Sequence, residues 1–295
     1  MSKLKLLTML GDYPNTLALK NGSVTSDLVQ LEFTEAAVPH DHFKKVIAGE
    51  FDVAELAIMT YLQARGWNKP VVALPVAISG RFQHAQLAYN TDFGTVTTSN
   101  IEGKRVGVRT YSQTTPAWVR GILQNDYGVD LSKIHWVTFQ DGHVPEYRDP
   151  PDSERAPQGQ TFMKMLLAGQ IDAAVVMTPD LKLPNIKSVI PDASKEIAAW
   201  YQAHQAIQLN HVLVVKQSLL QQHPDAVREV YRMMKESKRL SAEAVGADGI
   251  DYRPVGFRNN RRNFEMAAQY AWQQRLIPHE LKLEQLFDAL TRSLE

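Results

Sequence analysis

The chain has 295 residues, of which 44% are hydrophobic and 22% are charged, the composition of a globular protein long enough for two domains. Its 32 Lys and Arg residues balance its 32 Asp and Glu residues, and this lack of net charge argues against a nucleic acid or a membrane surface as partner. There is no Cys, which excludes disulfides, thiolate metal sites and cysteine nucleophiles.

The amino-terminal segment predicts a buried strand rather than an export signal. The apolar run Leu4–Leu10 is interrupted by Lys5, is too short for a signal peptide and leads into a turn without a cleavage site of small residues. No segment approaches the ~18 continuous apolar residues that cross a bilayer. A cytoplasmic protein is therefore expected.

Apolar runs alternate with helical stretches in the first part of the chain. Strands are expected at Leu4–Leu10, Leu28–Phe33, Phe51–Ile58 and Val71–Ile78, with helical stretches from His42 to Ile47 and from Met59 to Gly66. Such runs separated by helices indicate a parallel sheet covered on both faces. Pro75 has no N–H for a sheet hydrogen bond, so its strand is expected near an edge or to end early.

The segment from Asn100 to Asp126 carries a sign of a ligand site. Its predicted elements are a short helix capped by Asn100, a strand at Val106–Val108, a polar loop at Arg109–Thr115 and a helix that begins near Pro116 with Thr114 or Thr115 as its cap. The free N–H groups and partial positive charge of a helix start bind anions, and loops after strands hold ligands in open α/β sheets. The alternative is an ordinary capped helix after an ordinary strand.

The remaining elements complete a second α/β block and a helical tail. They are an extended segment at Leu87–Tyr89, a strand at Ile134–Phe139, a surface loop at Asp141–Gln158, a helix at Thr161–Ala168, a strand at Ile171–Met177, an extended segment at Ile207–Lys216 and helices at Pro224–Ala244, Arg261–Leu276 and Leu283–Leu294. Two α/β blocks joined by two extended crossings predict a two-lobed clamshell, with residues 1–88 and 212–295 in one lobe and 89–211 in the other. The crossings would form its hinge, and the interlobe cleft its site.

Short motifs follow one another along most of the chain. They are Asp12-Tyr13, Phe51-Asp52-Val53-Ala54-Glu55, Tyr61-Leu62, Arg81-Phe82-Gln83-His84, Asn90-Thr91-Asp92, the run from Ile101 to Val108, the run from Trp118 to Leu123, the run from Gly169 to Ala173, His211-Val212-Leu213-Val214, Asn260-Arg261-Arg262 and the run from Leu283 to Phe287. Together they resemble the 4,5-dihydroxyphthalate decarboxylase family. The resemblance implies the type 2 periplasmic-binding-protein fold. It also implies a carboxy-lyase (decarboxylase) of aromatic compound catabolism, in phthalate degradation, with a small aromatic carboxylate as its partner.

Four residues are candidates for the chemistry that such a reaction needs. Arg81 can pair bidentately with a substrate carboxylate. His84 can donate a proton near neutral pH, or it is a hydrogen-bonded histidine at a strand start. His211 is expected near His84 across the hinge, or it is a hinge residue that holds the backbone. Glu55, if buried, would have a raised pKa and serve as an alternative proton donor.

Other polar residues are expected to line the cleft and bind substrate. They are Tyr13, Tyr61, Tyr111, Gln113, Thr114, Thr115 and Arg261, each of which could instead serve packing or capping. His40 and His42 suggest a metal site, but a solvated helix start is the better interpretation because no third ligand is evident nearby. No cofactor is expected, and a divalent metal is left open.

Three functions remain open at this level. The leading one is a non-oxidative decarboxylase of a hydroxylated aromatic carboxylate such as 4,5-dihydroxyphthalate. The second is a solute-binding protein that captures an aromatic or other organic acid without converting it. The third is another lyase of the same fold, of the menaquinone-pathway type. Assembly into a homo-oligomer is also left open.

Overall fold

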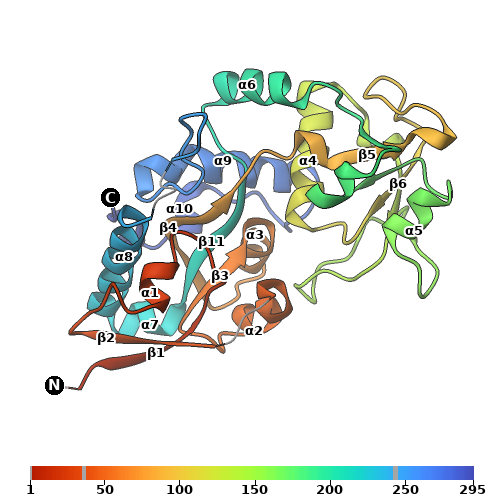
Figure 1. The fold of residues 1–295 in the computed structure, drawn as a ribbon. Coiled ribbons are helices and arrows are strands. Elements are labelled where there is room, and N and C mark those ends of the chain that lie inside the picture. The colour runs from red at the N-terminus through yellow and green to blue at the C-terminus, as the bar shows by residue number, and fades with distance from the viewer. Residues whose placement is uncertain (1, 35–37, 242–244) are drawn as a thin grey trace. The chain divides into compact units, whose positions relative to one another are not determined.

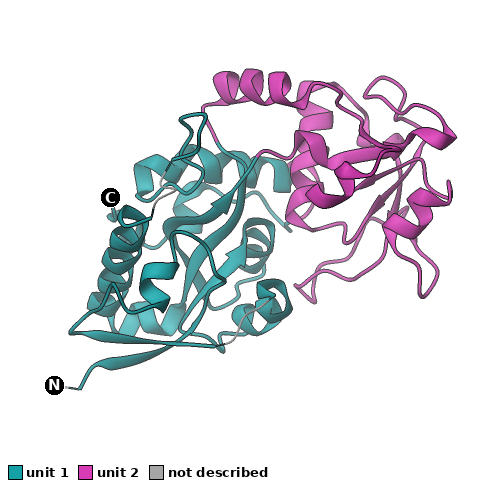
Figure 2. Cartoon of the chain, in the orientation of Figure 1, with its two compact units in different colours: residues 1–81, 207–272, 277–295 teal, residues 82–206, 273–276 magenta. Residues whose placement is uncertain are grey.

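A computed structural model describes residues 2–34, 38–241 and 245–295 of the chain. The chain divides into two compact units, shown in different colours in Figure 2. Unit 1 comprises residues 1–81, 207–272 and 277–295, and unit 2 comprises residues 82–206 and 273–276. The predicted lobes instead divide the chain at 88/89 and 211/212 and place residues 273–276 with the first lobe. Each unit is an α/β body with a sheet of its own.

The sheet of unit 1 has the strand order β2-β1-β3-β11-β4 (Figure 1). Its strands are β1 (Leu4–Met9), β2 (Val29–Phe33), β3 (Val53–Ala57), β4 (Val71–Gly80) and β11 (Leu209–Lys216). β1 is parallel to β2 and β3, whereas β11 is antiparallel to β3 and β4. The four predicted strands run parallel to one another, but the sheet as a whole is mixed, because the returning segment becomes the antiparallel strand between β3 and β4. β4 lies at the edge of the sheet, as Pro75 predicts.

The helices of unit 1 pack on this sheet and on one another. They are α1 (Leu17–Lys20), η1 (Pro39–His42), α2 (Phe43–Ile47), α3 (Ile58–Gly66), α7 (Gln217–Gln222), α8 (Pro224–Arg239), α9 (Phe257–Gln273), α10 (Leu283–Leu286) and α11 (Ala289–Arg292). α8 buries Val227, Val230 and Met234 at helical spacing in the hydrophobic core cluster of unit 1. The single helix predicted at 283–294 is two short helices, because Asp288 caps a new one by accepting a hydrogen bond from the Leu290 N–H.

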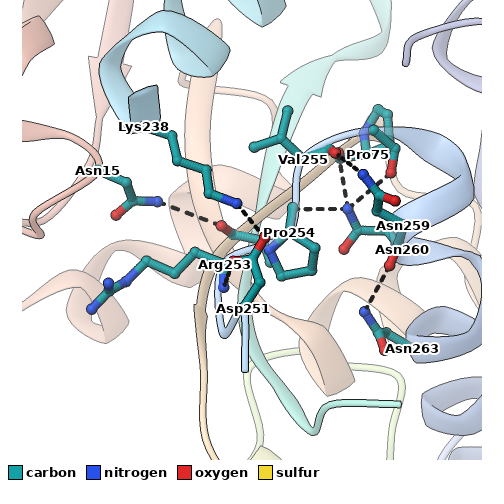
Figure 3. A network of polar contacts seen from close by, with 12 residues as sticks. Asn15, Pro75, Lys238, Asp251, Arg253, Pro254, Val255, Asn259, Asn260 and Asn263 are labelled. Carbon is teal, nitrogen blue, oxygen red and sulfur yellow. Dashed lines mark hydrogen bonds and ion pairs between the residues drawn. The ribbon is translucent and has the colours of Figure 1, made fainter. Parts of the chain in front are cut away.

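The segment 251–256 covers the edge strand β4, as Figure 3 shows. Asn260 of α9 donates hydrogen bonds from Nδ2 to the carbonyls of Pro75 at 3.1 Å, Pro254 at 2.8 Å and Gly256 at 3.0 Å. An ion pair between Lys238 and Asp251 ties the same segment to α8. The polar backbone groups that an edge strand exposes are thereby partly satisfied beside Pro75.

The sheet of unit 2 has the strand order β10-β5-β9-β6-β7-β8. The strands are β5 (Leu87–Asn90), β6 (Arg105–Val108), β7 (His135–Thr138), β8 (Glu154–Arg155), β9 (Ala173–Val175) and β10 (Ile186–Ser188). β9, β6, β7 and β8 are parallel, and β5 is antiparallel to β9 and β10. The predicted surface loop at 141–158 is therefore partly wrong, because Glu154 and Arg155 extend the sheet as β8.

The helices of unit 2 are η2 (His84–Gln86), η3 (Thr91–Phe93), α4 (Thr114–Asp126), η4 (Leu131–Lys133), α5 (Phe162–Leu167), η5 (Thr178–Lys182) and α6 (Ala193–His204). The short helix predicted to start at Asn100 is absent among these; Asn100 instead closes a turn by accepting a hydrogen bond from the Thr97 N–H at 2.8 Å. The predicted threonine cap of α4 is also wrong, because the helix begins two residues before Pro116 with Gln113 at the cap position. Among the helices of the described residues, none is long and apolar enough to cross a membrane.

Candidate functional site

A buried carboxylate and an imidazole meet on the sheet of unit 1. Glu55 lies in β3, where every residue is buried, and its own side chain is fully buried. β11 runs antiparallel beside β3 with His211 opposite Ala57, so Glu55 and His211 are diagonal neighbours on one face of the sheet. Nδ1 of His211 lies 2.8 Å from Oε2 of Glu55. The register of two strands that are distant in sequence creates this pair.

Glu55 collects hydrogen-bond donors, as a buried carboxylate must. The backbone N–H of Gly11, in the turn after β1, donates to Oε1 at 2.6 Å. Tyr13 also contacts the pair, with its hydroxyl 3.4 Å from Nδ1 of His211. The pKa of Tyr13 is raised by burial and then by the negative charge of Glu55 and a hydrogen bond to it. Donors thus lie beside both carboxylate oxygens of Glu55, and its role as an alternative proton donor stays a prediction.

The His211 ring is only partly buried by its neighbours. The ring packs edge-on against Phe43 with centroids 5.4 Å apart, and its side chain keeps 17% exposure. Among the described residues, none forms a hydrogen bond with Nε2. A carboxylate on Nδ1 and an unengaged Nε2 form the arrangement of an acid–base histidine, because the carboxylate orients the ring and stabilises its protonated form.

Arg81 is the last residue of 1–81, the first chain segment of unit 1. Its backbone N–H donates to the carbonyl of Gln208, so it is fastened beside the start of β11. Its side chain is half-buried, and this partial desolvation lowers the pKa of the guanidinium. Partial desolvation strengthens the attraction of such a group for a carboxylate.

His84 lies three residues on, in unit 2, within an aromatic cluster. Its ring is 2% exposed and packs against Phe82 and Trp200 with centroids 6.3 and 6.0 Å away. Nδ1 has no hydrogen-bond partner within the described ranges. Burial, and then the positive charge of His204, lowers the pKa of His84 to about 4. The ring is therefore neutral near pH 7. Its proximity to His211 stays a prediction, since the two residues belong to different units.

Because His84 is buried in its neutral form, the stability of unit 2 depends on pH. Between its folded pKa of about 4 and its ordinary value of 6.5, the unfolded chain binds a proton that the folded unit does not. We expect the free energy of unfolding to fall as pH drops through this range, by up to about 1 kcal/mol per pH unit from this group. Urea unfolding of the wild type and of His84→Leu at pH 7 and 4.5 would check this. An equal pH dependence in both would contradict it.

Two predicted substrate-binding residues of unit 1 have structural surroundings instead. Tyr61 is fully buried in α3, where its hydroxyl donates to the carbonyl of Leu286 and accepts from the Ala73 N–H, and burial raises its pKa to about 12. Arg261 is an exposed residue of α9 that pairs with Glu265 at 2.9 Å. Tyr61 leaves no surface for a substrate. Arg261 does not begin its helix as predicted, because α9 already starts at Phe257.

The remaining predicted contacts gather around the start of α4 in unit 2. Thr114 and Thr115 are buried in its first turn, and Gln113 precedes them half-buried. The ring of Tyr111 faces a residue that sequence reasoning missed, the fully buried Arg120, whose Cζ lies 3.9 Å from the ring centroid. The sequence signal that could have found Arg120 is its position inside the apolar run of a predicted helix.

The two histidines near residue 41 contact other side chains of unit 1. Nε2 of His40 lies 3.6 Å from Oδ1 of Asp41, and the ring of His42 packs against Phe51. Across residues 2–34, 38–241 and 245–295, no three His, Asp or Glu side chains are grouped to hold a metal ion.

Comparison with known proteins identifies relatives over most of the chain. The 4,5-dihydroxyphthalate decarboxylase of Comamonas testosteroni is 29% identical over 285 residues, which cover 89% of this chain and 84% of that protein. The resemblance to 4,5-dihydroxyphthalate decarboxylases is confirmed. The protein of the same name from Pseudomonas putida is 28% identical over 215 residues, covering 69% and 83% of the two chains. No protein-family model matches the chain.

Solved structures confirm the periplasmic-binding-protein fold. The periplasmic aliphatic sulphonate binding protein SsuA from Escherichia coli matches with a TM-score of 0.61 at 12% identity, covering 98% of this chain and 92% of that one. The desulfurization enzyme DSZB matches with a TM-score of 0.59 at 13% identity, covering 99% and 98%. The fold thus occurs in a binding protein and in an enzyme, so it does not decide between binding and catalysis.

Proposed function

We propose that this protein is a non-oxidative decarboxylase of a hydroxylated aromatic carboxylate such as 4,5-dihydroxyphthalate. The observation that carries the proposal is the similarity to two 4,5-dihydroxyphthalate decarboxylases along most of the chain. The Glu55–His211 pair supports it, because loss of CO₂ from an aromatic ring requires a positioned proton donor.

The proposed reaction replaces one carboxylate by a proton. The ring hydroxyl para to the departing carboxylate pushes electron density toward the carbon that bears it. That carbon takes a proton from Nε2 of the protonated His211, the carbon–carboxylate bond breaks, and its electron pair restores the aromatic ring as CO₂ leaves. Glu55 stabilises the imidazolium before transfer and stays ionised throughout. From 4,5-dihydroxyphthalate the product is 3,4-dihydroxybenzoate.

Arg81 is proposed to anchor a substrate carboxylate through its partly desolvated guanidinium. We expect Arg81→Ala to weaken binding by about 2 kcal/mol, roughly thirtyfold in the dissociation constant. Arg81→Lys keeps the charge but not the planar fork, so it should recover part of the affinity. Calorimetric titration with the substrate would measure both variants. Wild-type affinity in Arg81→Ala would remove this residue from the site.

The decisive experiment is to incubate the protein with 4,5-dihydroxyphthalate and follow both CO₂ and 3,4-dihydroxybenzoate. Phthalate, which lacks the hydroxyls, is the matched control and should not react. A parallel sample with a chelator tests whether a divalent metal assists. Absence of CO₂ from every dihydroxylated benzene dicarboxylate would refute the decarboxylase.

A solute-binding function is the second candidate, favoured by the fold shared with SsuA. Under it, the same incubation would give saturable quenching of the fluorescence of the five Trp residues without turnover. If neither signal appears, turnover of chorismate-derived enol ethers would test the lyases of the menaquinone-pathway type.

A further inference from the structure

Gly11 lies against Glu55 of the acid–base pair and against Tyr13, which contacts that pair. A Cβ atom built on it would lie 2.8 Å from Cε2 of Tyr13, 2.9 Å from Oε1 of Glu55 and 3.1 Å from Cγ of Pro39. Separations below 3 Å are too close for carbon. Gly11 is not among the glycines with positive φ, so the backbone conformation does not demand glycine here. The requirement is close approach, which brings its N–H to 2.6 Å from Oε1.

The two oxygens of Glu55 have different donors. Oε1 accepts from the peptide N–H of Gly11, and Oε2 faces Nδ1 of His211. A peptide N–H can only donate, whereas a neutral imidazole nitrogen can donate or accept. A carboxylate accepts at both oxygens, so the Gly11 N–H that holds Oε1 leaves Oε2 turned toward Nδ1 as an acceptor, and the imidazole must donate to it.

We propose that Gly11 is a positioning residue whose N–H orients Glu55 and thereby fixes the tautomer of His211. With Oε1 held by Gly11, Oε2 accepts from Nδ1, so neutral His211 keeps its hydrogen on Nδ1. The proton that His211 transfers is then the one on Nε2, the nitrogen without a protein hydrogen bond in the described part of the chain. The consequence for catalysis rests on the proposed function, but the tautomer itself does not.

Glu55→Gln tests the polarity without adding an atom. The Gly11 N–H requires an acceptor, so the amide oxygen should take the place of Oε1 and the amide NH₂ should face Nδ1. Neutral His211 must then accept at Nδ1 and carry its hydrogen on Nε2. The expected result is a reversal of tautomer between wild type and Glu55→Gln in ¹⁵N-histidine NMR at a pH where the ring is neutral. The His211 signals among the nine histidines are assigned by their loss in His211→Asn.

Tyr13→Phe is the matched control for that measurement. It removes the hydroxyl beside Nδ1 but leaves the Gly11 N–H in place, so the wild-type tautomer should persist. A wild-type tautomer in Glu55→Gln would overturn the proposal, because the amide would then be oriented by His211 and not by Gly11. A change of tautomer in Tyr13→Phe would also overturn it, by assigning the orienting role to the tyrosine hydroxyl.

Gly11→Ala tests the consequence for turnover. The added methyl should displace the Glu55 carboxylate, abolish the tautomer preference and lower kcat by up to about 100-fold with little change in KM. Gly66→Ala is the control, because its Cβ would lie 2.7 Å from Cδ of Pro278, equally crowded and in the same unit but away from Glu55. It should keep the wild-type tautomer and kcat. Equal losses in both variants would mean general destabilisation and refute the positioning role.

The two measurements separate this proposal from the proposed function. Reversal of the tautomer in Glu55→Gln without turnover of any phthalate would support Gly11 as positioning residue and refute the decarboxylase. Turnover of 4,5-dihydroxyphthalate by the wild type, with the wild-type tautomer retained in Glu55→Gln, would support the decarboxylase and refute Gly11 as positioning residue. If Gly11→Ala does not fold, Glu55→Gln still decides the question.

Discussion

His211→Asn is expected to lower kcat by roughly 1,000-fold while changing the affinity for substrate little, since removal of a general acid typically costs about 10²–10⁴ in rate. Asn is the informative replacement, because its amide nitrogen can occupy the place of Nδ1 and still donate to Oε2 of Glu55. The buried carboxylate is thereby not left without its donor, which would itself destabilise unit 1. What Asn lacks is a group at the position of Nε2.

The measurement is steady-state turnover of 4,5-dihydroxyphthalate, together with calorimetric binding of the same compound to the inactive variant. His223→Asn is the control, because it is an exposed histidine of unit 1 at the start of α8 and should retain wild-type kcat. An unchanged kcat in His211→Asn would remove His211 from the reaction. A loss of binding equal to the loss of kcat/KM would make it a binding residue instead.

Sequence reasoning selected both members of this pair but not the pair itself. Glu55 stood out as a carboxylate beside an apolar run, and His211 as a histidine on a returning extended segment. Each was assigned its own role, and His211 was expected to work with His84. Their contact depends on β11 lying between β3 and β4 in a particular antiparallel register, with His211 opposite Ala57. No local pattern in one sequence specifies the pairing of strands more than 150 residues apart.

Secondary structure could be predicted from the sequence where buried elements produce long apolar runs. The strands of unit 1 were predicted within a few residues, because β3 and most of β4 are buried and β1 buries Leu6, Thr8 and Met9. β8 has only two residues, both exposed, and β10 has only three residues in all, so both strands are too short for a periodic signal. α6 was missed because Trp200 is its only buried residue, so an apolar stripe is lacking. Short elements of that kind are held by neighbours rather than specified locally.

Arg120 carries the largest expected effect on stability. Its guanidinium is fully buried, and burial lowers its pKa. Nε donates to Oε1 of Gln274 at 2.8 Å, and Nη2 donates to the carbonyl of Tyr111 at 2.6 Å. The rings of Tyr111 and Trp136 lie 3.9 and 5.3 Å from Cζ. No carboxylate of the described residues forms an ion pair with it, so two neutral acceptors and two aromatic rings hold the cation.

We expect Arg120→Ala to lower the free energy of unfolding of unit 2 by about 3–4 kcal/mol. Two buried acceptors would lose their donor, at roughly 1–3 kcal/mol each, and the missing side chain would leave a cavity. Relief from burying a guanidinium offsets part of this loss, which is why the expected value lies below the sum. Arg155→Ala, which breaks an exposed pair with Asp141 in the same unit, should cost less than about 1 kcal/mol.

Arg120→Met separates the two causes, because methionine fills most of the space but restores no donor. If the cavity dominates, Met should recover most of the stability in urea unfolding followed by Trp fluorescence. If the acceptors dominate, Met and Ala should be similarly destabilised. The third outcome is a free energy of unfolding that falls no further in Arg120→Ala than in Arg155→Ala. That result would show that the desolvation of the buried guanidinium cancels the stabilisation from its hydrogen bonds and ring contacts. The residue would then have to be explained by binding rather than by stability.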